Sequence, residues 1–274
     1  MGMQINTNLA ANNTYRNLNS TQNDLSKSLE KLSSGLRINR AADDAAGLAI
    51  SEGLRSQVGG LTVAARNAQD GISVVQTAEG GLTEVHSILQ RVRDLAVQSG
   101  NDSNNADART AIQTEVTALK DELTRIGNST NFNGIDLLNS TGTLTFQVGA
   151  GYTAANDQIS VNLTDITAVA TVVEGLTFDT AANALTSIEA LDEQITAVSS
   201  ARSELGAVQN RFEHSIASTN VAKENLTAAQ SRIRDVDMAE EMVKYTRSNV
   251  LSQAGTAMLA QANQSTSSVL SLLR

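Results

Sequence analysis

Residues 54–96 decide the fold, and they read LRSQVGGLTVAARNAQDGISVVQTAEGGLTEVHSILQRVRDLA. An apolar residue recurs every seven positions along this stretch, and each one has an apolar companion three or four residues later, which is the pattern of a helix packed along a seam. The companion spacing changes from four to three partway along, because a straight helix drifts against a seven-residue repeat. The pattern predicts one long helix from about residue 45 to about residue 99. Its seven-apart positions are Leu54, Leu61, Ala68, Val75, Leu82, Leu89 and Ala96.

Gly59, Gly60, Gly71, Gly80 and Gly81 lie inside the stretch quoted above. Each costs about 1 kcal/mol of helix propensity relative to alanine. The alternative to a weakened helix is that they permit close packing of neighbouring helices.

Both ends of the chain carry the same kind of pattern. Residues 5–34 place Ala11, Leu18, Leu25 and Leu32 seven apart, with Tyr15, Gln22, Leu29 and Leu36 four residues after them. Further helices are predicted over about 106–127, from about 184 to 236, and over 238–273. The last of these carries Val243, Val250, Leu251, Ala254, Ala257 and Met258. We expect the two terminal seams to pair with each other and the two inner seams to pair likewise.

The middle of the chain changes period. Leu144–Val148 and Ile159–Leu163 alternate apolar and polar residues, which predicts two strands of a hairpin within about 139–165. Asn133-Gly134 indicates a tight turn, and 164–183 is ambiguous. The fold class expected is therefore mainly α, a long antiparallel coiled-coil-like helical bundle in two layers with a small β-hairpin region. Residues 1–44 and 237–274 would form the terminal layer, and residues 45–236 the core layer.

Composition excludes several classes of protein. The 274 residues are 41% hydrophobic and have a formal net charge of −9, with no Cys, no Pro and no Trp. Without cysteine there is no disulfide framework, no thiolate zinc site and no cysteine nucleophile. The acidic balance argues against a nucleic-acid partner, which needs a basic surface. No stretch approaches the roughly 20 apolar residues of a membrane span, so we expect no membrane partner.

A search for catalytic chemistry finds little. His86 and His214 each stand alone on a helix beside the apolar seam. Asp43-Asp44 and Glu240-Glu241 are adjacent pairs that point about 100° apart on a helix, and Asp235 and Asp237 lack the rest of a calcium loop. We expect no catalytic, cofactor or metal site, and hence no enzyme. A hydrolase would need a nucleophile–base pair, and a coiled-coil signalling rod would need a membrane span or a sensory domain.

Several long runs resemble one family, the bacterial flagellins, and they follow the family's order over nearly the whole chain. Those runs are SSGLRINRAADDAAGLAISEGLRSQ (33–57), NAQDGISVVQTAEGGL (67–82), LQRVRDLAVQS (89–99), NFNGIDLL (131–138), ENLTAAQSRIRDVDMAEEM (224–242) and LSQAGTAMLAQANQ (251–264). The centre is short, so the chain resembles a flagellin without large outer domains.

The resemblance implies a secreted structural subunit that polymerises into the extracellular flagellar filament. It also implies as partners the export apparatus, a C-terminal export chaperone, the filament cap and the hook–filament junction proteins. The alternative within the same organelle is the hook–filament junction protein, which shares the end layers. As the assembly seam we expect Leu18, Leu25, Leu29, Leu32, Val243, Val250, Leu251 and Met258 to pack between copies, unless the termini simply pair within the monomer.

The resemblance further implies recognition by the animal Toll-like receptor for flagellin. The family's contact residues fall on Arg91, Leu95 and Glu115. Arg91 and Leu95 are four apart and share one helix face, and we expect both to point outward from the Leu89–Val92–Ala96 seam. The alternative is that Arg91 and Glu115 form a solvated pair between neighbouring helices.

Overall fold

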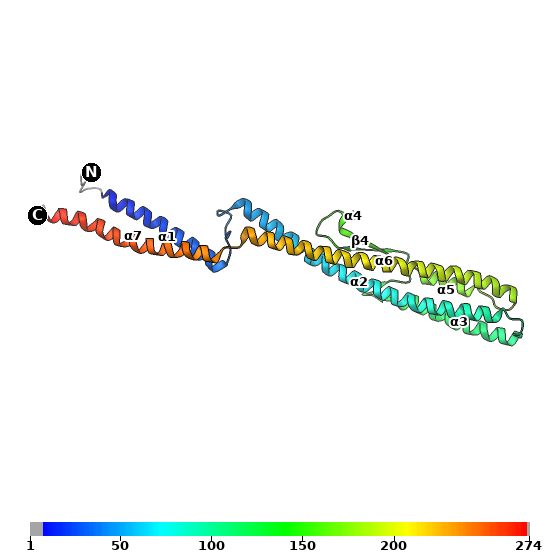
Figure 1. Ribbon diagram of the computed structural model, residues 1–274. Helices are drawn as coiled ribbons and strands as arrows, with labels where there is room; N and C mark the ends of the chain where they lie inside the picture. Colours follow the sequence, from blue (N-terminus) through cyan, green and yellow to red (C-terminus); the bar gives the residue numbers. More distant parts are fainter. Residues whose placement is uncertain (1–7, 273–274) are drawn as a thin grey trace. The chain divides into compact units, whose positions relative to one another are not determined.

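The computed structural model describes residues 8–272, with side chains described as far as Gln264. Helices dominate it (Figure 1). In chain order the elements are α1 (Leu9–Ser34), α2 (Ala45–Ser99), α3 (Ala106–Ser129), β1 (Asn131–Phe132), β2 (Ile135–Asp136), β3 (Thr143–Gln147), α4 (Ala154–Asp157), β4 (Gln158–Asn162), α5 (Ile166–Glu174), α6 (Ala181–Arg234) and α7 (Met238–Leu272).

The predicted fold class is confirmed: long helices pack against one another, and the strands form two small antiparallel pairs. The bounds predicted for the long helix match α2. The ambiguous segment 164–183 contains the short helix α5, whose first turn is capped by the Asp165 carboxylate. The predicted start at residue 5 and end at residue 273 lie outside the described residues.

The chain divides into two compact units. Unit 1 consists of residues 1–56 and 225–274, and unit 2 consists of residues 57–224. Unit 1 thus takes in residues 45–56 and 225–236, which the sequence analysis placed in the core layer. Contacts of the segment after α1 explain this grouping: the Arg37 N–H donates to the Arg234 carbonyl at 2.6 Å, and Arg234 Nη1 lies 2.6 Å from Glu52 Oε1. The assignment of 1–44 and 237–274 to a layer of an assembled polymer stays a prediction.

In unit 2, α2 contacts α3 on one side and α6 on the other. Arg91 of α2 lies 2.7 Å from Glu115 of α3, and Arg93 lies 2.6 Å from Asp192 of α6. A helix with two neighbours buries a wider stripe than one seam. Where α2 passes between them, both its seam and the flanking positions are fully buried, at Val75, Ala78, Leu82, Val85, Leu89, Val92, Leu95 and Ala96.

Three of the five glycines between residues 54 and 96 lie where a neighbour approaches closely. A Cβ atom at Gly71 would lie 2.7 Å from the Phe212 ring of α6, and one at Gly81 would lie 2.6 Å from Leu138. A Cβ atom at Gly60 would lie 2.9 Å from Ala150. Gly59 and Gly80 have nothing within 4 Å. Close packing therefore accounts for Gly60, Gly71 and Gly81 and leaves the other two without that reason.

The β region lies along unit 2. β3 and β4 pair antiparallel, with Thr143 opposite Asn162 and Gln147 opposite Gln158, inside the predicted range of 139–165. β1 and β2 form a second, smaller hairpin whose turn is Asn133-Gly134, with φ of 52° and 78°. These positive φ values are those of the tight turn that an Asn-Gly pair favours.

In unit 1, α1 and α7 pack side by side and antiparallel (Figure 1). Asn8 at the start of α1 donates to the Ala262 carbonyl near the end of α7, whereas Leu36 pairs with Asp235 just before α7 begins. α1 ends at Gly35, whose left-handed φ of 73° lets its N–H reach the Lys31 carbonyl. The predicted pairing of the terminal helices is thus observed within one chain.

Candidate assembly surface

Helix α7 turns several of its large apolar side chains away from α1, whereas Leu259 is half-buried. The half-buried positions that face α1 recur every three or four residues and are mostly small or polar, among them Ser248, Ser252, Gly255 and Ala262. A Cβ atom at Gly255 would lie 3.2 Å from Leu18 of α1, so the two helices touch there. At about 100° per residue, positions 243 and 250 fall opposite the face that meets α1, and positions 251 and 258 fall on the flank beside them. Those positions hold Val243, Val250, Leu251 and Met258, and all four side chains are exposed.

The predicted assembly seam therefore divides in two. On α1, Leu18, Leu25 and Leu32 are half-buried, and Leu29 is exposed. The seven-apart positions of α1 that start at Ala11 therefore pack within the chain. Their companions Tyr15, Gln22 and Leu29 face outward. We call the exposed residues Val243, Val250, Leu251 and Met258 the α7 stripe.

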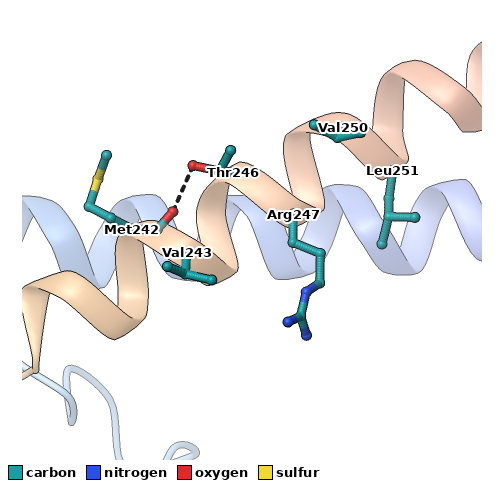
Figure 2. Close-up of a pocket in the computed structure, with 6 residues that line it drawn as sticks. All are labelled: Met242, Val243, Thr246, Arg247, Val250 and Leu251. Atoms are coloured by element: carbon teal, nitrogen blue, oxygen red, sulfur yellow. Dashed lines mark hydrogen bonds between the residues drawn. The ribbon is translucent and has the colours of Figure 1, made fainter.

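Part of the α7 stripe lines a shallow groove of about 540 Å³ (Figure 2). Met242, Thr246 and Arg247 complete its walls, and the Thr246 hydroxyl is turned back onto the Met242 carbonyl at 2.8 Å. Arg247 makes no ion pair within the described part of the chain. The sequence analysis did not predict Met242 and Arg247 as part of this surface, because neither lies seven residues from Val243 or Val250. Four-residue spacing does connect Met242, Thr246 and Val250.

Unit 1 has almost no core of its own. Among its residues with described side chains, Ile38 is the one hydrophobic residue that is fully buried, whereas unit 2 has a continuous cluster from Ala68 to Phe212. Burial of apolar side chains is the main favourable term in folding. The α1–α7 pair therefore has most of its apolar area still available for contact with another molecule.

The three residues expected to contact a receptor are brought together, but not as predicted. Arg91 Nε and Nη2 both donate to Glu115 Oε1, at 3.0 and 2.7 Å, and both side chains remain about half exposed. This is the solvated interhelical pair given above as the alternative. The expectation that Leu95 points outward is wrong, because Leu95 is only 2% exposed. It lies beside the seam, on the part of the α2 surface covered by a second neighbouring helix.

The acidic residues singled out in the sequence serve as local structure. Asp44 accepts the Gly47 N–H at the start of α2, and Asp237 accepts the N–H groups of Ala239 and Glu240 at the start of α7. Asp43 accepts the N–H groups of Asn39 and Arg40, and these hydrogen bonds lower the pKa of its carboxyl below the ordinary value. Glu240 and Glu241 both pair with Lys244.

The remaining candidates for chemistry are dispersed. His86 Nε2 lies 3.0 Å from the Gln90 amide nitrogen, and His214 is exposed on α6. Across residues 8–272, no three His, Asp or Glu side chains are grouped as a metal would require. No described helix combines the length and the apolar character that crossing a membrane demands.

Comparison with known proteins accounts for both ends of the chain. Residues 5–143 match the model of the bacterial flagellin N-terminal helical region, and residues 188–273 match that of the flagellin C-terminal helical region. Flagellin of Halalkalibacterium halodurans is 54% identical, and flagellin of Bacillus subtilis is 50% identical. Both alignments cover 99% of this chain and 100% of the relative.

A solved structure from Vibrio parahaemolyticus, of a protein assigned to the flagellar hook-associated class, is also similar. It covers 70% of this chain and 100% of that chain, with a TM-score of 0.58. At 15% sequence identity this likeness shows a shared fold alone.

Proposed function

Because the chain belongs to the bacterial flagellin family, we propose that the α7 stripe is a surface through which copies pack in the flagellar filament. The chain is a structural subunit that polymerises into this filament, and it is not an enzyme. The full-length relatives at 50–54% identity are flagellins, so the hook–filament junction alternative is not favoured. The observation that supports the proposal is the exposure of four large apolar side chains on one face of α7.

The stripe suits a contact that repeats without closing. Burying apolar surface contributes roughly 25 cal/mol per Å², and unit 1 leaves this contribution mostly unused within the chain. A surface that packs on a different surface of the next copy generates a helical polymer when the rotation does not close a ring. We place residues 1–44 and 237–274 in the inner layer of the filament and residues 45–236 in the outer layer.

Val250→Asp tests the stripe with little risk to the fold, since the Val250 side chain is 60% exposed in the subunit. An unpaired charge buried in a dry contact costs several kcal/mol, so we expect no filaments by electron microscopy and no pelletable polymer. The control is Gln253→Asp, which adds the same charge at an exposed polar position of α7. Normal filaments from Val250→Asp would contradict the proposal, and loss of filaments from the control would make the effect one of charge alone.

We further propose that the subunit leaves the cell through the flagellar export apparatus and meets a C-terminal export chaperone, a filament cap and the hook–filament junction proteins. A chaperone that covers the α7 stripe would keep it from packing prematurely, since exposed apolar surface favours association. Under this proposal Val250→Asp weakens chaperone binding as well as polymerisation. Binding measured by calorimetry, with Gln253→Asp as the control, decides between a chaperone site on the stripe and one elsewhere.

For the animal Toll-like receptor we propose that the ion-paired Arg91 and Glu115 form the exposed part of the contact, and that Leu95 acts from beneath by holding α2 in place. The support is the half exposure of the pair and the burial of Leu95. In a receptor reporter assay with monomer, Arg91→Ala should lower the response. Arg93→Ala removes a similar pair on the α6 side and serves as the control. Equal responses from both variants and the wild type would exclude this surface.

A further inference from the structure

The side chain of Tyr152 is fully exposed, with a relative exposure of 101%. It lies in the loop between β3 and α4, on the lobe of unit 2 labelled α4 in Figure 1. A tyrosine ring offers a large apolar area and one O–H group, and such a side chain anchors an interface when a partner buries it in a pocket.

The loop that carries Tyr152 is held by hydrogen bonds on both sides of it. The Asp157 carboxylate accepts the N–H groups of Gly151 at 3.1 Å and Thr153 at 3.0 Å. The Gln147 amide donates to the carbonyls of Gly149 at 3.0 Å and Gly151 at 2.9 Å. A loop already ordered in this way loses little conformational freedom when its side chain is bound.

The loop also rests directly on helix α2. Ala150 approaches Gly60 so closely that a Cβ atom at Gly60 would lie 2.9 Å from the Ala150 Cβ. Tyr152 is therefore presented from a fixed point of unit 2.

A pocket of about 210 Å³ lies on the same unit, lined by residues of α2, the β1–β2 hairpin and β3. Its walls are apolar and aromatic, and its polar groups include the Asp70 carboxylate and Asn133. Asp70 is exposed to solvent and, within the described residues, makes no ion pair or side-chain hydrogen bond. The apolar side chains that line the pocket are Val74, Phe132, Ile135, Leu137, Leu144 and Phe146.

Tyr152 does not fill this pocket in its own chain, since its side chain is fully exposed. The loop rests on α2 at Gly60, and the pocket includes Asp70 and Val74 of the same helix. Those positions are 10 and 14 residues further along, which is about 15–21 Å at 1.5 Å per residue.

We propose that Tyr152 of one copy inserts into this pocket of a neighbouring copy in the filament, an inference that rests on the chain being a filament subunit. Charge and hydrogen bonding match: the pocket contains an anionic acceptor, and the phenol is uncharged and brings one O–H donor. A protruding side chain and a pocket on different parts of one molecule give a heterologous contact, which extends into a polymer when it does not close.

The critical concentration for assembly tests the side chain. Tyr152→Ala removes no contact within the subunit, so its thermal unfolding should be unchanged, whereas its critical concentration should rise about tenfold or more, as for a buried aromatic anchor. Tyr152→Phe keeps the ring and should lie between the two. Val221→Ala, an exposed apolar residue of α6, is the matched control and should assemble like the wild type. Wild-type assembly by Tyr152→Ala overturns the proposal.

Cross-linking tests the pocket, and the absence of cysteine from the chain makes it specific. The double variant Tyr152→Cys/Ile135→Cys, assembled above its critical concentration and treated with a short bis-maleimide, should give a ladder of covalent oligomers. Tyr152→Cys/Glu193→Cys places the second thiol on exposed α6 and should give none. Normal filaments without a ladder, or a closed dimer from Tyr152→Cys alone, overturn the contact. A wild-type chain that forms no filaments would instead count against the proposed function.

Discussion

At the scale of single residues, Leu95 is the position where helical spacing and packing disagree. Spacing alone places it outside the Leu89–Val92–Ala96 seam, and the structure buries it. Its neighbour Val97, two residues on, is 52% exposed. We expect Leu95→Ala to lower the free energy of unfolding by about 2–5 kcal/mol, the usual cost of truncating a buried leucine. Val97→Ala should change it by less than about 0.5 kcal/mol. Denaturant unfolding of the monomer measures both, and equal effects would mean that Leu95 is not packed as described.

Asp165 is the residue whose charge stabilises a helix start. Its carboxylate accepts the hydroxyl of Thr167 at 2.6 Å and the Thr167 N–H at 2.8 Å, and these bonds lower its pKa below the ordinary value. Because the folded-state pKa is the lower one, the stabilisation is complete above the unfolded pKa of about 3.9 and is lost as the pH falls through the folded value.

Asp165→Asn keeps a capping oxygen but cannot titrate. We therefore expect the wild type to be the more stable at pH 7 and the difference in unfolding free energy to shrink below about pH 4. Asp165→Ala should lose about 1 kcal/mol at pH 7. A difference between wild type and Asp165→Asn that stays constant from pH 7 to pH 3 would exclude this role of the charge.

At the scale of elements, the seven-residue repeat predicted the helices well because it reports the face that packs. The bounds of α2 and the shift of its companions from four to three both followed from it. The repeat assumes one partner per helix, and that assumption fails in two ways. α2 has two partners, so Leu95 is buried. α7 packs on α1 mostly through small and polar residues, so Val250 and Met258 of its own repeat are exposed.

The glycines of α2 show what propensity misses. Gly71→Ala gains about 1 kcal/mol of helix propensity, yet its Cβ would meet the Phe212 ring at 2.7 Å. Overpacking of this kind costs about 1–3 kcal/mol, so we expect net destabilisation and a lower melting temperature. Gly80→Ala, in the same helix with nothing within 4 Å, should be neutral or stabilising by up to about 1 kcal/mol. If Gly71→Ala and Gly80→Ala were equally stabilised, the Phe212 ring would be able to move aside without a loss of packing energy.

At the scale of the whole molecule, the two units differ in how much apolar area they bury. Unit 2 has a continuous hydrophobic core, whereas unit 1 leaves many of its large apolar side chains exposed and available to a partner. The sequence could predict that apolar seams exist at the ends of the chain, since spacing is local. It could not predict which residues of each seam are buried between α1 and α7 of the same chain, because that depends on which faces of the two helices meet. Nor does any spacing rule indicate Tyr152, because the proposed contact depends on a pocket that only the folded chain assembles from α2, the β1–β2 hairpin and β3.

Local stability should follow this division. Unit 1 contributes Ile38 alone to the fully buried hydrophobic residues with described side chains, whereas Leu89 of α2 lies at the centre of the unit 2 core. Segments with few buried apolar contacts open at low free-energy cost, while core amides exchange only through nearly global unfolding.

In the monomer we expect the amide of Val250 to open at about 0–2 kcal/mol and that of Leu89 at close to the full unfolding free energy. Assembly should raise the protection of Val250 towards that of Leu89, because neighbouring copies then supply the missing contacts. Hydrogen exchange on monomer and filament, resolved by peptide mass spectrometry, measures this. Strong protection of Val250 already in the monomer would show that α1 and α7 are stable without neighbours.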